Sequence, residues 1–252
     1  MSHLKDLTVP GFTINYVEET GSTNDDCLKA AENGAPEYSV FVADYQSQGR
    51  GRGGRQWNST RKSSLTFSIL LYPTPEKTRY AGRFSALGAL SLVRALENME
   101  QIKTYIKWPN DVLLKNQKIA GVLVESLWDG EQLKAIILGM GINILEESIP
   151  DVKRIIYPAT SIQTETGKAL DRAELLKEIL KQIMELRPIF PTTEFIDLWN
   201  EHLAYKNEEA FFHADDGRLL RYLLQYVDEE GCLIVRNHLG KIQKVSSGEL
   251  AA

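Results

Sequence analysis

Residues 46–57 read Gln-Ser-Gln-Gly-Arg-Gly-Arg-Gly-Gly-Arg-Gln-Trp, with four glycines and three arginines between Gly49 and Arg55. Glycine lets backbone N–H groups come close to a ligand. Arginine adds a permanent positive charge and a planar donor group that fits carboxylates and phosphates. We therefore expect this loop to bind anions. A disordered nucleic-acid-binding segment of the RGG type is the competing interpretation.

The same segment matches the dinucleotide fingerprint Gly-x-Gly-x-x-Gly at Gly49, Gly51 and Gly54. That fingerprint requires a helix directly after the glycines. Here a short polar stretch leads instead into residues 65–71, whose composition predicts a strand. We therefore exclude a Rossmann site.

Composition narrows the class of protein. The chain has 252 residues, is 43% hydrophobic and 25% charged, and carries a net charge of −5. These values are typical of a globular protein with one large domain, or one domain and a small module. An acidic balance argues against a protein whose main ligand is duplex DNA.

The sequence also indicates a cellular compartment. It has no apolar run long enough to span a membrane, and residues 1–10 lack the apolar core of a secretory signal. We expect a cytoplasmic protein with no membrane partner, in which Cys27 and Cys232 are free thiols. The four histidines show neither metal-ligand nor catalytic spacing.

Hydrophobic periodicity predicts interleaved helices and strands. Helices are expected over 24–33, 80–97, 170–188 and 195–204, and strands over 12–17, 38–43, 65–71, 103–107, 111–114, 119–125 and 133–138. Thr23 is the expected cap of the first helix, and Asp171 with Glu174 that of the third.

After Asn207 the pattern changes to short strands separated by glycine turns, at 210–212, 219–227, 232–236 and 241–245. We therefore predict an α+β core over residues 1–206 and a small β-barrel module over 207–252.

Lys107-Trp108-Pro109-Asn110-Asp111 is an unusual segment in a strand-rich region. Pro109 stops the ladder and forces a turn, which presents a lysine, an amide and a carboxylate together. Lysine offsets phosphate charge, and the two oxygen ligands suit magnesium or a ribose. A plain turn is the alternative.

Three other segments place small residues beside hydrogen-bonding groups, as expected around a polar ligand that the backbone approaches closely. They are Ser22-Thr23-Asn24, Lys118-Ile119-Ala120-Gly121 and Gly139-Met140-Gly141-Ile142-Asn143. Taken singly, each has a structural explanation: an N-cap, an exposed lysine at a strand start, and a β-bulge or turn.

Taken together and in this order, these segments resemble those of the biotin protein ligase family, over nearly the whole chain from Ser22 onward. The resemblance implies a mixed β-sheet catalytic core packed with helices, of the class II synthetase-like biotin/lipoate ligase type. It also implies that the C-terminal module is an SH3-like β-barrel.

The resemblance further implies a two-step ligase. Biotin and ATP, with Mg²⁺, form biotinyl-5′-AMP and release pyrophosphate. A lysine of a biotin carboxyl carrier protein domain then takes the biotin and releases AMP. The chemistry agrees, because two mutually repelling anions need concentrated positive charge, and the reactive anhydride needs a loop that excludes water.

By analogy with the family, Arg52 and Lys118 would be catalytic. The residues implied for biotin are Ser22, Thr23, Asn24, Gln46, Gly49, Arg50, Gly51, Arg52, Lys118, Gly121, Gly139 and Gly141. Those implied for ATP are Arg52, Arg55, Trp57, Lys107, Asn110, Asp111 and Asn143, with Asp111 a possible ligand of Mg²⁺.

Two departures from the family pattern bear on function. Many relatives carry a further arginine where Gly53 stands, so we expect a looser loop here. The ligase-like region begins close to the first residue, so we expect no helix-turn-helix domain and no operator binding.

A homodimer is possible, because related ligases pair through an edge strand. A lipoate or octanoate ligase, which shares the core and the adenylate chemistry, is the nearest alternative.

Overall fold

A computed structural model of the protein describes residues 3–58, 60–73, 81–149, 157–213 and 218–251. The α-helices are α1 (Thr23–Glu32), α3 (Phe84–Glu100), α4 (Ile162–Thr166), α5 (Arg172–Leu186) and α6 (Thr193–Glu201). The strands are β1 (Thr13–Val17), β2 (Ser39–Ala43), β3 (Ser64–Leu71), β4 (Tyr105–Lys107), β5 (Asp111–Leu114), β6 (Gln117–Asp129), β7 (Gln132–Asn143), β8 (Glu209–His213), β9 (Leu219–Val227), β10 (Leu233–Arg236), β11 (Ile242–Val245) and β12 (Glu249–Ala251). Short 3₁₀ turns lie at Leu4–Asp6, Arg52–Gly54, Ala81–Arg83 and Glu146–Ser148.

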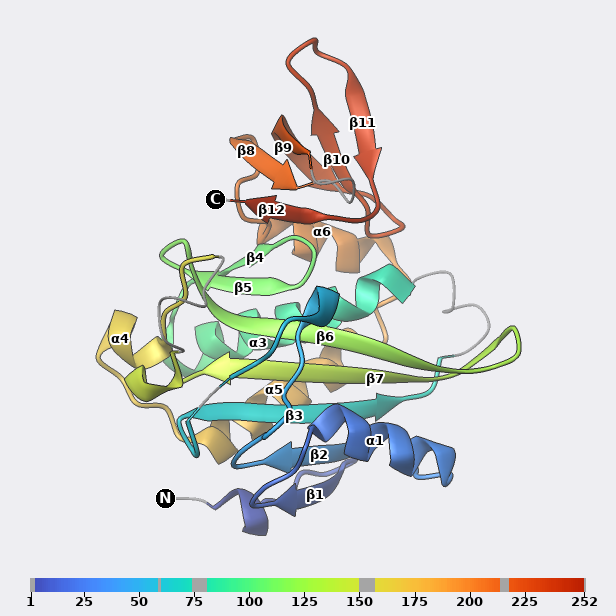
Figure 1. The fold of residues 1–252 in the computed structure, drawn as a ribbon, viewed down its shortest axis with the longest axis vertical. Helices are drawn as coiled ribbons and strands as arrows, with labels where there is room; N and C mark the ends of the chain where they lie inside the picture. Colours follow the sequence, from blue (N-terminus) through green and yellow to red (C-terminus); the bar gives the residue numbers. More distant parts are fainter. Residues whose placement is uncertain (1–2, 59, 74–80, 150–156, 214–217, 252) are drawn as a thin grey trace.

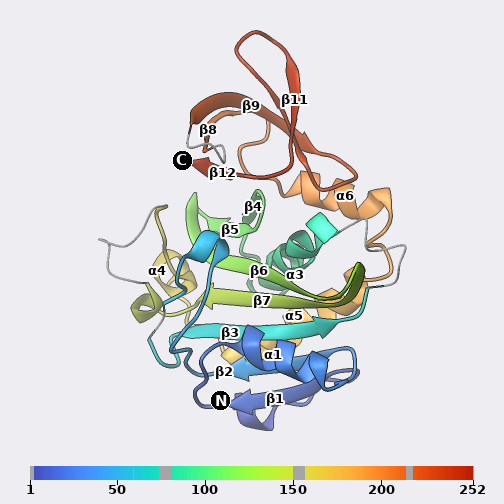
Figure 2. The ribbon, with the colours of Figure 1, turned by 45° about the vertical axis from the view of Figure 1, so that its right-hand side comes forward.

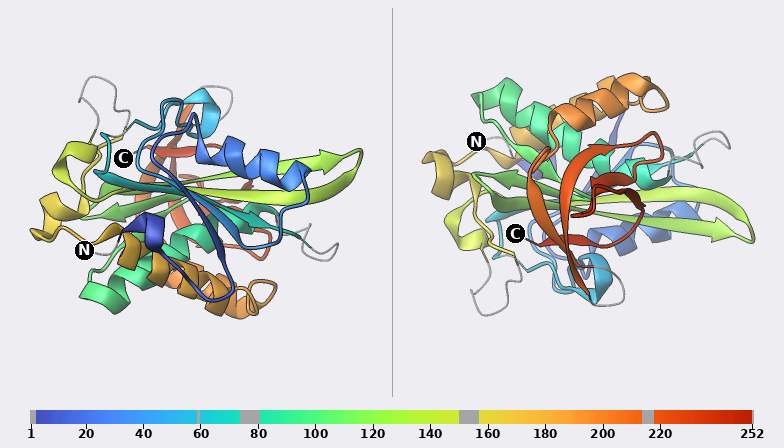
Figure 3. Two further views of the ribbon diagram at one scale, coloured as in Figure 1. Left: turned by 90° about the horizontal axis from the view of Figure 1, so that it is seen from below. Right: turned by 90° about the horizontal axis from the view of Figure 1, so that it is seen from above.

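The core is a seven-stranded mixed sheet with the order β1-β2-β3-β7-β6-β5-β4. Strands β1 and β2 are parallel, and the other neighbours are antiparallel. Every residue of the interior strand β3 is buried, because helices cover the sheet on both sides (Figure 3). The predicted α+β class with a mixed, helix-packed sheet is confirmed.

The two faces of the sheet have different chemistry. In β3, the side chains of Leu65, Phe67 and Ile69 join the main hydrophobic core, which also holds α3 and α5. The alternate residues, Thr66 and Ser68 among them, face the other way, where α1 lies (Figures 1 and 3). The β3 sequence therefore builds one apolar face and one face with small polar side chains.

The C-terminal strands form a second sheet, antiparallel throughout, with the order β11-β10-β9-β8-β12. The long strand β9 pairs with β8 along its first half and with β10 along its second, with a bulge in the β9–β10 pairing. This sheet lies next to the β4–β5 end of the core (Figures 1 and 2). It fits the small β module expected from the sequence.

Two buried side chains join this sheet to the core. The Trp108 indole Nε1 donates to the Gly231 carbonyl at 3.0 Å. The Arg83 guanidinium, which is 1% exposed, donates from Nε to the Glu229 carbonyl at 2.7 Å and from Nη1 to the Phe190 carbonyl at 2.9 Å.

Several elements differ from the sequence-based expectation. Strands expected over 119–125 and 133–138 extend to 117–129 and 132–143, because β6 and β7 continue as a long pair past the glycines. Strand β12 was not predicted. The helix expected over 80–97 is α3, Phe84–Glu100, and Tyr80 lies outside the described residues.

The cap of the first helix was predicted wrongly. Thr23 is the first residue of α1 rather than its cap, and the Ser22 side chain at the N-cap position makes no capping hydrogen bond. The Asp171 cap of α5 is confirmed, since Asp171 Oδ1 accepts from the backbone N–H groups of Ala173 at 2.9 Å and Glu174 at 3.2 Å.

Within the described part of the chain, none of the helices has both the length and the apolar character that crossing a membrane requires.

Replacing Arg83 with alanine is expected to lower the free energy of unfolding by about 2–4 kcal/mol, because the buried Phe190 carbonyl and the part-buried Glu229 carbonyl lose their donor. Urea unfolding followed by circular dichroism measures this. The matched control is Arg94→Ala, which breaks only the part-exposed pair with Glu185 and should cost at most about 1 kcal/mol. Equal losses in the two variants would contradict the joining role of Arg83.

Candidate functional site

The candidate site is a cavity between the N-terminal end of α1, the Gly/Arg loop (residues 49–55) and the bare face of β6 and β7. About 120 Å³ of it is open. Its lining is made by Ser22, Thr23, Asn24, Gln46, Arg50, Gly51, Arg52, Arg55, Gln56, Trp57, Asn110, Asp111, Lys118, Gly121, Val122, Leu123, Gly139, Met140 and Gly141.

Most of the residues singled out from the sequence meet in this cavity, although they come from segments far apart in the chain. Three do not line it. Gly49 closes the base of the loop, where its carbonyl accepts from the Trp57 N–H at 2.9 Å. Lys107 lies buried behind Asp111. Asn143 is buried at the end of β7 and donates its amide to the Thr160 carbonyl at 3.1 Å.

The Gly/Arg loop is folded into a small hairpin. The Gly51 N–H donates to the Arg55 carbonyl at 2.7 Å, and a β-bridge joins Arg50 to Gln56. Gly53 and Gly54 turn the chain with φ values of 63° and 76°, a left-handed conformation that glycine adopts at little cost. Glycine at position 53, where the family pattern has arginine, therefore suits the local backbone.

One end of the cavity is a cluster of buried polar side chains. Gln46 Oε1 accepts from the Thr23 backbone N–H at 2.8 Å and lies 3.0 Å from the Thr23 hydroxyl. Gln46 thus supplies the cap of α1 that Ser22 does not. Ser68 Oγ lies 2.7 Å from Thr23 Oγ1 and donates to Asn24 Oδ1 at 2.5 Å.

Two glycines of β7 let side chains lie directly on the sheet. A Cβ at position 139 would stand 2.1 Å from Asn24 Oδ1, and a Cβ at position 141 would stand 2.4 Å from the Trp57 ring. Gly139 pairs with Ser68 on β3, and Gly141 pairs with Gly121 on β6. The close approach to the backbone expected at these glycines is present, and the side chains of Asn24 and Trp57 make it.

The loop arginines are held by acids and an amide. Arg50 makes a two-pronged contact with Asp25 at 2.7 and 2.6 Å and also reaches Glu125 at 3.1 Å. These hydrogen bonds hold the pKa of Asp25 below its usual value. Arg52 donates to Asn110 Oδ1 at 3.1 Å.

The third loop arginine reaches the C-terminal sheet. Arg55 Nη1 donates to Glu249 Oε1 of β12 at 2.8 Å. Burial by itself raises the pKa of Glu249, but the hydrogen bond from Arg55 and the nearby lysines bring it below its usual value. The carboxylate therefore acts as a counter-ion within the site.

Two lysines flank Asp111, Lys118 on the cavity side and Lys107 in the interior. Lys118 Nζ pairs with Asp111 Oδ1 at 2.7 Å and remains a quarter exposed to the cavity. Lys107 is 1% exposed, lies 3.8 Å from Asp111 Oδ2, and faces the Tyr157 ring at 3.6 Å. Its Nζ has no hydrogen-bond partner, and burial lowers its pKa.

The donor set does not fit a magnesium ion held by the protein. Asp111 was the possible ligand, but its two carboxylate oxygens face the ammonium groups of Lys118 and Lys107. Mg²⁺ prefers several free oxygens in an octahedral arrangement. Asp111 is better described as the shared counter-ion of two lysines, and we derive no step through a protein-bound metal.

The sequence interpretation missed four polar residues that hold the lining side chains in place: Asp25, Ser68, Glu125 and Glu249. Two of them had a signal. Serine and threonine alternate with apolar residues in 64–69, and Glu125 alternates with Val122 and Val124 in a strand. Asp25 and Glu249 had none, because exposed acids are common in helices and near chain ends.

Two other features of the described structure lie outside this site. A larger hollow of about 630 Å³ adjoins β1 and the start of α5. Its central carboxylate, Asp44, is already satisfied by the Tyr16 hydroxyl at 2.8 Å and by Arg172 at 2.7 Å.

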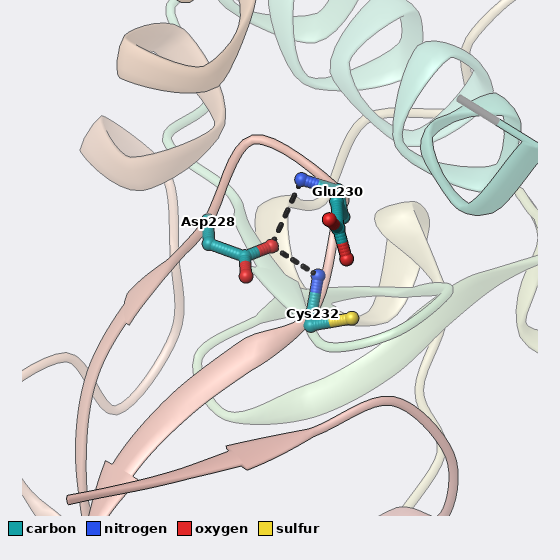
Figure 4. Close-up of side chains that lie close together, drawn as sticks. All are labelled: Asp228, Glu230 and Cys232. Atoms are coloured by element: carbon teal, nitrogen blue, oxygen red, sulfur yellow. Dashed lines mark hydrogen bonds between the residues drawn. The ribbon is translucent and has the colours of Figure 1, made fainter. Parts of the chain in front are cut away.

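Among the described residues, one group of side chains comes close enough to hold a metal: Asp228, Glu230 and Cys232 (Figure 4). Asp228 Oδ1 accepts from the backbone N–H groups of Glu230 at 2.9 Å and Cys232 at 3.0 Å, and Lys244 pairs with both acids. These contacts describe a turn between β9 and β10, and burial raises the pKa of the Cys232 thiol.

Replacing Lys107 with methionine is expected to raise the free energy of unfolding of the ligand-free protein at pH 7, by about 1 kcal/mol or more, because a desolvated charge is replaced by an apolar group while Asp111 keeps its ion pair with Lys118 at 2.7 Å. The lowered pKa fixes the pH dependence. Between that pKa and the usual value near 10.5, the folded state binds fewer protons than the unfolded state, so wild-type stability rises with pH.

The gain from Lys107→Met should therefore be largest at neutral pH and shrink toward pH 10. Urea unfolding of both proteins at the two pH values measures it. A variant less stable than wild type at pH 7 would mean that the counter-ions outweigh the desolvation of Lys107.

Comparison with known proteins agrees with this geometry. A family model described as the biotin/lipoate A/B protein ligase family matches residues 16–143. The bifunctional ligase/repressor BirA of Bacillus spizizenii is 30% identical over 96% of this chain and 74% of its own length. The biotin--[acetyl-CoA-carboxylase] ligase of Paracoccus denitrificans is 31% identical over 88% of this chain and 93% of its own.

Among solved structures, the biotin protein ligase of Aquifex aeolicus, in complex with biotin and ATP, superposes with a TM-score of 0.78. It is 30% identical, and the match covers 95% of this chain and 97% of that one. The chain therefore belongs to the biotin/lipoate A/B protein ligase family.

Proposed function

We propose that this chain is an ATP-dependent ligase that activates biotin as biotinyl-5′-AMP and transfers it to a lysine of a biotin carboxyl carrier protein domain. One observation carries the proposal: a single cavity has buried hydrogen-bonding groups at one end and Arg52 and Lys118 at the other. Membership of the ligase family and the named relatives support it.

The polar end suits the ring of biotin. A cyclic urea offers two N–H donors and one carbonyl acceptor, and Thr23, Asn24 and Gln46 line the cavity with matching groups. The dithiolane ring of lipoate has no such groups, so it would gain no hydrogen bonds from these side chains. The cavity therefore favours biotin over lipoate or octanoate.

The charged end suits the reacting groups. In the first step, a biotin carboxylate oxygen attacks the α-phosphorus of ATP, and the bond to the β-phosphate breaks. Arg52 and Lys118 would offset the repulsion between the two anions and stabilise the charge that develops on the α-phosphoryl oxygens. Arg55, with Lys107 behind it, would act on the nucleotide side together with Trp57, Asn110, Asp111 and Asn143.

In the second step, an acceptor lysine amine attacks the carbonyl carbon of the anhydride, the carboxyl–phosphate bond breaks, and the amine loses a proton. Water must be kept away until then. About 120 Å³ of open cavity is small beside the 300–1,000 Å³ that is usual for ligand pockets. We infer that the Gly/Arg loop and Trp57 move outward to admit the substrates and then cover the intermediate.

The same loop argues against the RGG interpretation. RGG segments are disordered and present free arginines. Here the loop is a hydrogen-bonded hairpin, and Arg50 and Arg55 are paired with Asp25 and Glu249.

We propose a boundary between a catalytic domain, 1–206, and the C-terminal module, 207–252, supported by the change of sheet between α6 and β8.

A homodimer formed through an edge strand is proposed at β1, since a bridge from Ile106 to Leu203 covers the opposite edge at β4. Absence of DNA binding and a cytoplasmic location are proposed from the acidic charge and the sequence.

The direct test is incubation with ATP, Mg²⁺, biotin and a carrier domain, followed by intact-mass measurement of the carrier. Addition of one biotinyl group supports the proposed function. A lipoyl or octanoyl addition from a mixture of the three acids, with no biotinyl addition, would overturn it.

Lys118→Ala is expected to lower the rate of pyrophosphate release about 100-fold or more, because it removes a cation that faces the cavity. A pyrophosphate release assay measures this at saturating biotin and ATP. Lys115→Ala is the control, since Lys115 is 65% exposed at the nearby turn and pairs with Glu165 outside the cavity. Unchanged release in Lys118→Ala would remove this lysine from the chemistry.

Arg52→Gly is expected to let the intermediate escape and to label lysines of bystander proteins, because the loop loses its contact with Asn110 and with the anion. Mass spectrometry of added serum albumin detects the stray label. Arg61→Gly, at an exposed arginine paired with Glu19, is the control and should label only the carrier. Strict labelling of the carrier by the Arg52 variant would contradict a retention role.

A further inference from the structure

Four side chains from three elements form a continuous hydrogen-bonded chain at the polar end of the cavity. Thr23 Oγ1 lies 2.7 Å from Ser68 Oγ, and Ser68 Oγ lies 2.5 Å from Asn24 Oδ1. Asn24 Nδ2 lies 2.6 Å from Glu125 Oε2. Thr23 and Asn24 line the cavity, whereas Ser68 and Glu125 stand behind them.

The carboxylate at the end of this chain fixes the direction of every hydrogen bond. A carboxylate only accepts, so the Asn24 amide must turn its NH₂ group toward Glu125. Asn24 Oδ1 then faces Ser68, and the Ser68 hydroxyl must donate to it. The Ser68 proton is thereby used, so Ser68 Oγ can only accept from Thr23.

The Thr23 hydroxyl is left without a proton for a ligand. Its proton goes either to Ser68 Oγ at 2.7 Å or to Gln46 Oε1 at 3.0 Å. Both acceptors belong to the protein. Toward the cavity, Thr23 therefore presents lone pairs only, and it accepts from a donor such as a urea N–H group.

We propose that Glu125 is a positioning residue that sets the direction of this chain and so makes the cavity selective for a ligand N–H at Thr23. The inference rests on the proposed function for the identity of the ligand, a cyclic urea. Glu125 does not line the cavity itself, and it acts through Asn24 and Ser68.

The variant Glu125→Gln tests the direction with almost no change in size. A glutamine can accept or donate, so Asn24 can rotate and every bond in the chain can reverse. In the reversed chain, the introduced amide donates to Asn24 Oδ1, Asn24 donates to Ser68, and Ser68 donates to Thr23, so Ser68 no longer takes the Thr23 proton. That proton is then shared between Gln46 Oε1 and a ligand acceptor in the cavity.

The structure supplies a matched control. Glu125 also pairs with Arg50 at 3.1 Å, so its replacement disturbs the Gly/Arg loop as well. Asp25 pairs with the same Arg50 at 2.6 Å and belongs to α1, but both its side-chain hydrogen bonds go to Arg50 rather than to Thr23, Asn24, Ser68 or Glu125. Asp25→Asn therefore weakens the ion pair of Arg50 but preserves the direction of the hydrogen bonds from Thr23 to Glu125.

The probes are biotin and two analogues of it. In each analogue, an oxygen replaces one of the two ring N–H groups, which converts the cyclic urea into a cyclic carbamate. Isothermal titration gives their dissociation constants. In the wild type, the analogue altered at the nitrogen facing Thr23 should bind about 10–100-fold more weakly than biotin, because two acceptors face each other. In Glu125→Gln this ratio should fall about tenfold, and in Asp25→Asn it should stay at the wild-type value.

A second variant guards against a folding defect. The Glu125 side chain is 35% exposed, so Glu125→Leu changes the packing of the interior only slightly. It also frees Asn24 to rotate, and it should lower the ratio as Glu125→Gln does. A wild-type ratio in both Glu125 variants, or an equal fall in Asp25→Asn, would overturn the positioning role. Failure of the wild type to bind biotin would instead overturn the proposed function, so the two failures are distinguishable.

Discussion

The site depends on a stretch of sheet that carries no side chains. At Gly139 and Gly141, strand β7 exposes bare backbone, and Asn24 and Trp57 lie against it. Any larger residue at these positions would collide with those side chains. The neighbouring strands continue this open surface, since Gly121 lies opposite Gly141 and Ser68 lies opposite Gly139. The hollow for the substrates follows from this arrangement of small residues.

Charge compensation is the second organising feature. The cations of the site are held before any substrate arrives, by Asp25, Glu125, Asp111 and Glu249 or by the Asn110 amide. Such pairs keep the guanidinium and ammonium groups in place, which lowers the reorganisation needed when an anion binds. Glu249 belongs to β12, so the C-terminal sheet contributes directly to the charge balance of the loop.

Much of the fold and the site was predictable from the sequence because the pattern is local. The hydrophobic periodicity of residues 172–186 predicts α5 with its Asp171 cap. The glycine-containing segments meet in one cavity, as expected. What escaped was set by tertiary contacts. Gln46 caps α1 from a distant segment, so the nearby Ser22 and Thr23 gave a misleading capping signal.

The counter-ions escaped for a related reason. Asp25 and Glu249 become part of the site only when α1 and β12 pack beside the Gly/Arg loop. Strands β6 and β7 ran beyond their expected ends because each stabilises the other through pairing, which a window along one strand does not register.

The central claim is that one cavity brings two repelling anions together, with the urea ring at Thr23 and the reacting groups between Arg52 and Lys118. A crystal structure with a non-hydrolysable analogue of biotinyl-5′-AMP tests it most directly. The account predicts the urea within hydrogen-bond distance of Thr23 and the acyl-phosphate mimic in contact with Arg52 and Lys118. An analogue bound elsewhere, or these two cations turned away from the acyl-phosphate mimic, would contradict it.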